Sequence, residues 1–256
     1  MPPNFAEYYD AVINWEKRLA REMSLLEELA RSAGRRVLVP ACGTGGHIVA
    51  LAERGFSVIG FDADEDVVAF AQKRIDRAAN AISAAGGEAK VSLLRMEQAG
   101  ELGPVHDAAF CLGNALPGIS GEGQLPAALK GIAGALRVGG ILLTQNLNYD
   151  LRWKEKAHWF PLLAGETAQE EVLLVKFADH EQEAINFHAM FLVREKAGGK
   201  WQSQVRSSRQ IPLFRDVIAQ LVIQAGFGKL QFWGDYAKSP FDPAGSNDLL
   251  VAAEKL

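Results

Sequence analysis

The sequence has few of the residues from which disulfide scaffolds and metal sites are built. Two cysteines, Cys42 and Cys111, occur in 256 residues, and they form no CxxC pair. The five histidines are scattered and form no HExxH motif. This usage argues against disulfides and against a zinc site, so we expect no metal and a location in the reducing cytoplasm.

Runs of basic residues and long apolar runs are also missing. Lys and Arg total 27 against 31 Asp and Glu, which gives a net charge of −4. A nucleic-acid-binding surface normally needs a basic stripe. No apolar stretch approaches the about 20 residues of a membrane-spanning helix. The first residues, "MPPNFAEYYD", lack the apolar core of a secretory signal. We therefore expect neither a nucleic acid nor a membrane as a partner.

Apolar sequence is plentiful, and it alternates between strand and helix patterns. Hydrophobic residues make up 48% of the chain, enough for a large core. Helical spacing over 20–30 ends at Gly34. Strands are then predicted at 36–41, 56–62, 90–96, 107–113 and 141–148, and helices at 47–55, 65–87 and 125–140. This alternation predicts an α/β fold with a mainly parallel sheet covered on both faces.

The pattern changes after about residue 149. Stretches at 170–178, 184–195 and 200–211 are rich in β-formers and are joined by polar turns such as "KAGGK". They predict an antiparallel insert. A helix at 213–226 and strands at 229–235 and 248–255 then return to the first pattern.

A glycine-rich turn follows the first predicted strand, in "VLVPACGTGG". Strand, then 43–46, then helix brings backbone N–H groups close to a ligand. The next strand ends at Asp62, close to the spacing of about 20 residues at which an acid binds the ribose of a nucleotide. Ile48 stands where the dinucleotide pattern needs a third glycine, which argues against NAD and favours S-adenosylmethionine. The alternative is a tight turn without a ligand.

Several stretches of the chain resemble class I S-adenosylmethionine-dependent methyltransferases. Within that group the chain is most similar to the glycine and glycine/sarcosine N-methyltransferases. The shared stretches are "INWEKR", "RVLVPACGTG", "GFSVIGFDAD", "HDAAFCLGNAL", "LRVGGILL", "NYD" and "FWGDY". The resemblance implies a doubly wound, Rossmann-like, seven-stranded sheet whose last strand is antiparallel. It further implies one domain over 1–256, with an N-terminal helical cap (1–34), a cofactor-binding half (35–150), a β-rich substrate-side insert (151–211) and a final helix and strands (212–256).

The resemblance also implies roles for matching residues. Asp62 would hold the ribose, Arg18 would meet the carboxylate of the cofactor, and Asn114 would act in catalysis by placing the acceptor beside the sulfonium. The implied cofactor-binding residues are Tyr9, Trp15, Arg18, Ala41, Cys42, Gly43, Thr44, Gly45, Asp62, Ala63, Glu97, Gln98, Leu112 and Gly113. The implied substrate-side residues are Asn114, Leu147, Tyr149, Trp159 and Phe160.

Two departures from the family pattern bear on the site. Val39 replaces an acid that commonly supports the amino end of the cofactor, and "VLVPxCG" is similar to the thiopurine methyltransferase group. Leu147 stands where the glycine enzymes carry an arginine that clamps the substrate carboxylate, and an unpaired buried carboxylate is costly. Lys176 or Arg209 would be a compensating charge, with a solvated role as the alternative for both.

The sequence therefore predicts methyl transfer from S-adenosylmethionine, giving S-adenosylhomocysteine, to a small molecule by in-line displacement. An amine acceptor requires no general base, and Asn114 would accept a hydrogen bond from it; Trp153, Trp159 and Phe160 would form an aromatic pocket. An oxygen or sulfur acceptor, with His180 or His188 as a base for oxygen, is the alternative, as is a cofactor-binding protein without turnover. Acidic charge and the lack of an NPPY or DPPY motif disfavour a nucleic-acid substrate. We expect a monomer or homodimer.

Overall fold

The larger β-sheet has seven strands in the order β10–β11–β5–β4–β1–β2–β3 in the computed structural model, which describes residues 5–256. Its strands are β1 (Arg36–Pro40), β2 (Ser57–Asp62), β3 (Glu88–Leu93), β4 (His106–Cys111), β5 (Leu136–Leu147), β10 (Phe227–Trp233) and β11 (Asp248–Lys255). The helices are α1 (Phe5–Val12), α2 (Trp15–Ala33), α3 (Gly46–Ala52), α4 (Glu65–Ala84), η1 (Met96–Leu102), η2 (Leu116–Gly118), α5 (Gln124–Ala135), α6 (Tyr149–Glu155) and α7 (Arg215–Gln224). Residues 1–4, the start of the expected helical cap and of the stretch tested for a secretory signal, lie outside the described part.

The strand directions confirm the expected fold class. β1 pairs in parallel with β2 and with β4, and β5 pairs in parallel with β4. β11, the last strand of the chain, is antiparallel to both of its neighbours, β5 and β10. The chain runs outward from β1 to β3 and then returns to β4, so the order reverses between β1 and β4. In open α/β sheets ligands bind outside the carboxyl ends of the strands at this reversal.

The two faces of the sheet are covered by different helices, as the alternating strands require. In β1, Leu38 packs with α5, η1 and α7, whereas Val37 and Val39 pack with α2 and α3. β4 divides in the same way, with Ala109 in the first layer and Phe110 in the second. Because successive side chains of a strand point to opposite faces, a buried strand feeds two apolar layers.

The ends of the helices that flank the site are set by short polar side chains. Asn14 caps α2 by accepting a hydrogen bond from the Lys17 N–H at 2.9 Å, and Gly34 follows its last residue. Asp64 caps α4 through the N–H groups of Asp66 and Val67. The helix predicted over 20–30 is therefore real but begins earlier, at Trp15, because the cap lies at Asn14.

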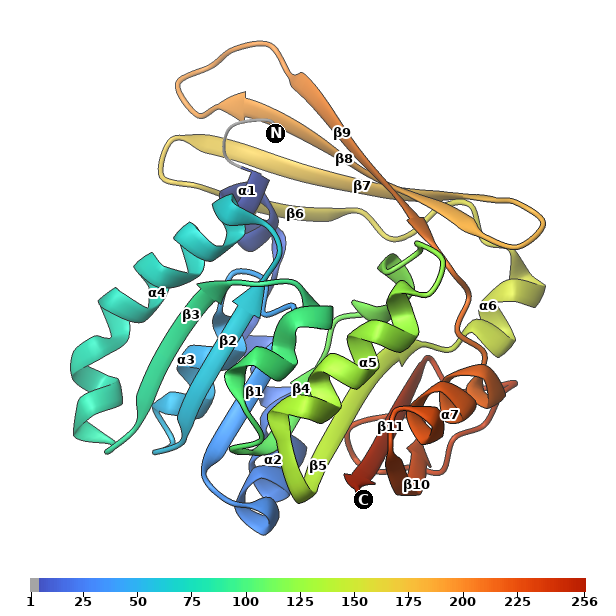
Figure 1. Ribbon diagram of the computed structural model, residues 1–256. Coiled ribbons are helices and arrows are strands. Elements are labelled where there is room, and N and C mark those ends of the chain that lie inside the picture. The colour runs from blue at the N-terminus through green and yellow to red at the C-terminus, as the bar shows by residue number, and fades with distance from the viewer. Residues whose placement is uncertain (1–4) are drawn as a thin grey trace.

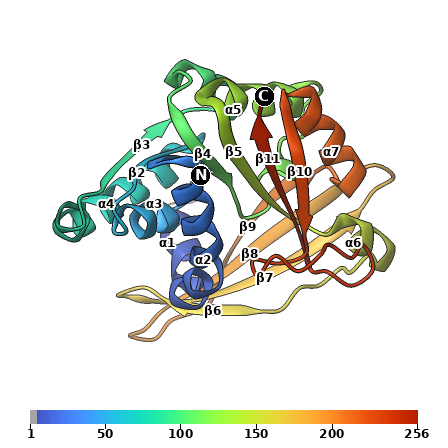
Figure 2. The same ribbon diagram turned by 90° about the horizontal axis from the view of Figure 1, so that it is seen from below.

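A second, four-stranded antiparallel sheet is formed by β6 (Leu163–Glu166), β7 (Glu170–His180), β8 (Ile185–Glu195) and β9 (Gln202–Gln210). It lies across one end of the larger sheet, with α1 against it at one side and α6 at the other (Figures 1 and 2). Tyr8 and Val12 of α1 pack on Leu174 and Phe191 of this sheet. The insert predicted from the β-rich sequence is thus a separate layer over the site.

Two predicted elements had wrong boundaries, and two further elements were not predicted. The helix expected over 125–140 ends at Ala135, because Leu136 has strand geometry and pairs with His106 of β4. Apolar spacing in "ALRVGG" did not separate a helix from a buried strand. The strand expected over 90–96 is β3 and runs from Glu88 to Leu93 in register with β2. Neither α6 nor β6 was predicted.

Candidate active site

The glycine-rich turn joins β1 to α3 through left-handed backbone. Ala41, Gly43 and Gly45 have φ of 48°, 56° and 82°. Gly45 precedes α3, and a Cβ there would meet Ala71 of α4 at 3.0 Å. The Gly43 N–H donates to Asp62 Oδ2 at 3.0 Å, which joins the turn to the end of β2. The expected pairing of turn and acid is therefore present, with glycine where the backbone requires it.

Two adjacent cavities meet at this turn and share Tyr9, Gly43 and Thr44. The first, here called the Arg206 cavity, is lined by Phe5, Ala6, Tyr9, Gly43, Thr44, Asp62, Asp64, Val67 and Arg206. The second, the Arg18 cavity, is lined by Tyr9, Trp15, Arg18, Val39, Ala41, Cys42, Gly43, Thr44, His47, Leu112, Gly113 and Ala115. Most of the predicted cofactor-binding residues line one or the other. The exceptions are Gly45, Ala63, Glu97 and Gln98.

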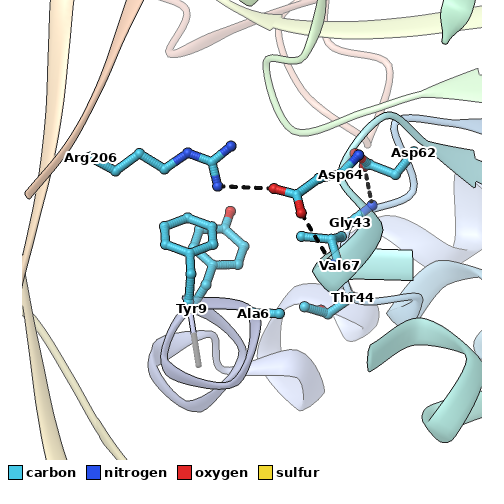
Figure 3. Close-up of a pocket in the computed structure, with 9 residues that line it drawn as sticks. Ala6, Tyr9, Gly43, Thr44, Asp62, Asp64, Val67 and Arg206 are labelled. Carbon is cyan, nitrogen blue, oxygen red and sulfur yellow. Dashed lines mark hydrogen bonds and ion pairs between the residues drawn. The ribbon is translucent and has the colours of Figure 1, made fainter. Parts of the chain in front are cut away.

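The second sheet closes the Arg206 cavity from above. Figure 3 shows Arg206 extending from β9 towards Asp64, beyond Tyr9. The Arg206 Nη1 lies 3.2 Å from Asp64 Oδ2, and its guanidinium carbon lies 4.3 Å from the centre of the Phe5 ring. Arg206 therefore connects the insert to the start of α4 and to α1. The sequence analysis missed it, because no local motif marks it.

Asp10 fastens the N-terminal helices to the glycine turn. Its Oδ1 accepts hydrogen bonds from Trp15 Nε1 at 2.6 Å and from Thr44 Oγ1 at 2.7 Å, and its Oδ2 pairs with Arg74 of α4. The Trp15 ring lies below the Arg74 and Arg18 guanidinium groups and against Gly46, where a Cβ would clash with it. The position of Trp15, a predicted cofactor-binding residue, thus depends on an acid that the sequence analysis did not select.

A buried charge cluster fixes Arg18. Its Nε lies 3.3 Å from Oε1 of Glu22, one turn later in α2, and Glu22 also pairs with Arg21 Nη2 at 2.7 Å and with His47 Nε2 at 2.7 Å. Burial would raise the pKa of Glu22, which is 1% exposed, but the His47 hydrogen bond and the Arg18 charge lower it to about 2. Burial lowers the pKa of His47, so a neutral imidazole donates to the carboxylate. Arg18 is therefore held near Gly113, whose Cβ position would lie 3.3 Å from its Nη2.

Three of the predicted cofactor-binding residues, Ala63, Glu97 and Gln98, lie outside both cavities, beyond the ends of β2 and β3. The Leu94 N–H donates to the Asp62 carbonyl, which keeps these two strand ends together. Glu97 is in η1, and its Oε1 pairs with Arg95 Nε at 2.5 Å. Gln98 accepts from the Arg95 N–H. Ala63 is exposed next to Asp62. The structure thus gathers these residues at one edge without giving them a shared cavity.

Asn114 lies at the centre of a hydrogen-bond network just after β4. Its φ is 61°, and its N–H donates to the Gln145 carbonyl of β5. Its Oδ1 accepts from the Leu147 N–H at 2.9 Å, and its Nδ2 donates to Tyr149 Oη at 3.0 Å. Tyr149 in turn donates to Gln210 Oε1 of β9 at 3.0 Å. A left-handed residue held this tightly is typical of functional sites.

A third cavity, the Phe160 cavity, is formed in part by hydrogen-bond partners of Asn114. It is lined by Leu147, Tyr149, Arg152, Ala157, Phe160, Ala178, His180, Ile185, Phe187 and Gln210. Of the predicted substrate-side residues, Leu147, Tyr149 and Phe160 line it. Burial raises the pKa of Tyr149 to about 12, so its hydroxyl stays protonated near neutral pH.

Trp159 points the other way. It is 69% exposed and pairs with Phe177 on the outer face of the second sheet, at a ring distance of 5.4 Å. Phe160 faces inward and contacts Phe187 at the same distance. Adjacent residues of an extended segment face opposite sides, so only one of the two aromatics reaches the cavity. Trp153 packs against His180 and Phe214 beside it.

The two candidate histidines also lie on different faces of the second sheet. His188 stacks on Phe177 and pairs with Asp179 on the outer face, whereas His180 lines the Phe160 cavity. Arg209 pairs with Glu181 at 3.5 Å. Burial raises the pKa of the Cys42 thiol and raises that of Cys111 to about 12, so neither is a thiolate nucleophile.

Two wider features concern the described residues 5–256. No helix there is long and apolar enough to cross a bilayer. In the same range, no group of three or more His, Cys, Asp or Glu side chains is arranged to hold a metal ion.

Comparison with known proteins gives relatives of one kind. The sequence model described as thiopurine S-methyltransferase matches residues 6–96. A glycine/sarcosine N-methyltransferase of Halorhodospira halochloris is 24% identical over 98% of this chain and 87% of its own length. The glycine N-methyltransferase of Rattus norvegicus is 35% identical, over 52% of this chain and 47% of its own length.

A solved structure gives the same architecture. An S-adenosylmethionine-dependent methyltransferase from Clostridium acetobutylicum matches 95% of this chain and 92% of its own, with a TM-score of 0.73 and 13% sequence identity. At that identity the likeness concerns the fold.

Proposed function

The chain belongs to the class I S-adenosylmethionine-dependent methyltransferases, and we propose that it methylates an amine nitrogen of a small molecule by in-line displacement. Membership implies S-adenosylmethionine as cosubstrate. The observation that carries the proposal is the Asn114 network, which touches the linings of two cavities. The neighbours of Asn114 in sequence, Gly113 and Ala115, line the Arg18 cavity. Its hydrogen-bond partners Leu147, Tyr149 and Gln210 line the Phe160 cavity. Two cavities linked by one hydrogen-bond network suit transfer between two bound molecules.

The residues present fit S-adenosylmethionine. The glycine turn leaves open space at Gly43, where a Cβ would meet nothing within 4 Å. Asp62 accepts one N–H at each carboxylate oxygen and keeps lone pairs for two ribose hydroxyls. Arg18 presents a guanidinium, held by Glu22, to a carboxylate. When bound, the cosubstrate supplies a methyl group already activated by its sulfonium.

The remaining work is positioning. Holding two reactants in line is worth about 7–11 kcal/mol of barrier. Asn114 Oδ1 has two lone pairs, and Leu147 uses one of them, so the second is free to accept a hydrogen bond from an amine N–H. The nitrogen lone pair would form the new N–C bond while the C–S bond breaks, and the surplus proton would leave to solvent.

The lining of the Phe160 cavity favours nitrogen as the acceptor atom. Among the described residues its lining contains no carboxylate, and its tyrosine stays protonated, which leaves His180 as the candidate base. A neutral amine needs none. Relatives that match nearly the whole chain are named glycine/sarcosine N-methyltransferases. The match to the thiopurine S-methyltransferases stops at residue 96, before every residue that lines this cavity, so it gives no argument for sulfur.

The first experiment is methyl transfer from labelled S-adenosylmethionine to glycine, sarcosine and a panel of small amines, with the product analysed by NMR. An N-methyl product supports the proposal. Methyl on oxygen or sulfur contradicts the nitrogen assignment, with His180 then the candidate base. Binding of S-adenosylmethionine without any product from a metabolite extract contradicts catalysis.

The Asn114→Ala variant tests the role of the network. We expect turnover to fall about 100-fold because the acceptor loses its alignment, while the dissociation constant of S-adenosylmethionine changes less than about 3-fold. Asn186→Ala is the matched control, because Asn186 on β8 lines none of the three cavities and bonds Glu181. Equal losses in turnover and cosubstrate binding would contradict the positioning role.

A further inference from the structure

Two cations from different elements lie in the lining of the Phe160 cavity or next to it. Arg152, on α6, lines the cavity, and its guanidinium carbon lies 5.9 Å from the centre of the Phe160 ring. Lys176 is on β7 two residues before Ala178, which also lines the cavity, so the two residues share the inner face of the strand. The Lys176 carbonyl accepts the Phe160 N–H. The lining of this cavity thus includes hydrogen-bond partners of Asn114 together with Arg152, and Lys176 lies beside it on β7.

Neither cation has an acidic partner. Throughout residues 5–256, no carboxylate lies within 4.0 Å of Arg152 or Lys176, although Arg206 and Arg209 on the same sheet each have one. The Nε of Arg152 is buried without a hydrogen-bond partner. Nδ1 of His180, another lining residue, is buried and unpartnered too. Buried polar atoms without a partner are rare in folded proteins, so both side chains have the capacity to bind a polar group that enters the cavity.

Positive groups predominate around Arg152 and Lys176. Burial and the Arg152 charge both lower the pKa of Lys176. Burial, His158 and Lys156 lower the pKa of His180, and Asp179 opposes them from the outer face. Asp248 acts on Arg152 only through space, because its own hydrogen bond comes from Gln145. In a protein of net charge −4, an unneutralised pair of partly buried cations is costly unless an anion binds it.

We propose that Arg152 and Lys176 bind a carboxylate of the methyl acceptor. The acceptor is then an amino carboxylate, with its amine at Asn114, its carboxylate at the cation pair and an apolar part against Phe160, Phe187 and Ile185. This inference rests on the proposed function. It also accounts for Leu147, because the charge that the glycine enzymes place at that position is supplied here by α6 and β7. A guanidinium suits a carboxylate because its planar fork donates two parallel hydrogen bonds.

The test compares acids with their neutral counterparts. Glycine, β-alanine, 4-aminobutyrate and phenylalanine are assayed beside the corresponding amides, with the wild type and with Arg152→Gln and Lys176→Gln. We expect each variant to raise KM for the acids by about 30-fold or more, the effect of removing one partner of a buried charge pair, and to leave KM for the amides within about 2-fold. Arg209→Gln is the control, since Arg209 is paired with Glu181 away from the cavity.

A binding measurement separates this inference from the proposed methylation. Calorimetry with phenylacetate and phenylacetamide, in the presence of S-adenosylhomocysteine, needs no turnover. Tighter binding of the acid that is lost in Arg152→Gln supports the site even if no amine is methylated, in which case only the nitrogen assignment fails. Equal binding of acid and amide, equal KM changes for acids and amides, or preferential binding of inorganic phosphate would overturn the carboxylate site.

Discussion

The Arg18 and Phe160 cavities differ in how the polar groups in and around them are satisfied. Around the first, Asp10, Glu22 and Asp62 hold lining residues in place, and each binds two or more donors from the protein. In the second, Arg152 Nε and His180 Nδ1 are buried without a partner. A preorganised site loses little conformational entropy when it binds its ligand, whereas unpartnered polar groups gain their hydrogen bonds only from a bound molecule. We infer that the protein itself orders the cosubstrate site at the Arg18 cavity and that the Phe160 cavity determines specificity for the acceptor.

The largest expected effect is on the cosubstrate side, at Asp62. The Asp62→Ala variant removes the acceptor proposed for two ribose hydroxyls and the anchor of the Gly43 N–H. Hydrogen bonds to charged groups contribute about 1.5–3 kcal/mol each. We therefore expect the dissociation constant of S-adenosylmethionine to rise roughly 1,000-fold, or about 4 kcal/mol, measured by calorimetry.

Asp66→Ala is the control for this change. Asp66 is exposed on the first turn of α4, close to Asp62 in sequence. Its N–H, not its carboxylate, bonds Asp64. Its substitution should change cosubstrate affinity less than 2-fold, roughly. If Asp62→Ala binds S-adenosylmethionine as the wild type does, the proposed role of the turn and its acid is wrong.

The second prediction concerns the charge cluster behind Arg18. The pKa of Glu22 is lowered from 4.5 to about 2 in the folded protein, so its anion contributes stability that is present above pH 4.5 and is lost as the pH falls towards 2. At about 1.4 kcal/mol per unit this contribution is of the order of 3 kcal/mol. We expect urea unfolding of the wild type to weaken over that window more steeply than that of Glu22→Gln. Parallel pH profiles of the two proteins would show that Glu22 titrates normally.

The sequence predicted one of these regions much better than the other, for a physical reason. Gly43 and Asp62 follow neighbouring strands whose order a local motif specifies, so their contact was predictable. Asp10, Glu22 and Gln210 act through contacts between segments far apart in the chain, and no spacing rule selects them. Trp159 and Phe160 differ by one position, and a strand of unknown register does not tell which of two neighbours faces inward.

The third prediction tests whether α1 closes the cosubstrate side. Asp10→Ala removes the hydrogen bonds to Trp15 and Thr44 and the ion pair with Arg74. We expect the dissociation constant of S-adenosylmethionine to rise about 10-fold because α1 must then be ordered on binding, with KM for the acceptor unchanged. Glu7→Ala, on the same helix, is the control, because Glu7 makes no hydrogen bond or ion pair within residues 5–256. If KM for the acceptor rises as much as the dissociation constant of S-adenosylmethionine, α1 does not act on the cosubstrate site alone.

The smallest expected effect distinguishes the two faces of the second sheet. Phe160→Ala removes an inward ring that packs on Phe187 and lies beneath Arg152, so we expect acceptor KM to rise about 5-fold, as for the loss of one aromatic pair. Trp159→Ala removes a larger ring from the outer face and should leave KM within about 2-fold. The two changes are adjacent in sequence and similar in chemistry. A difference in acceptor KM between the two variants, measured by steady-state kinetics, therefore shows which face of the sheet contacts the acceptor. If Trp159→Ala proves the more damaging, the acceptor does not enter through the Phe160 cavity, and the contrast between the two cavities no longer explains specificity.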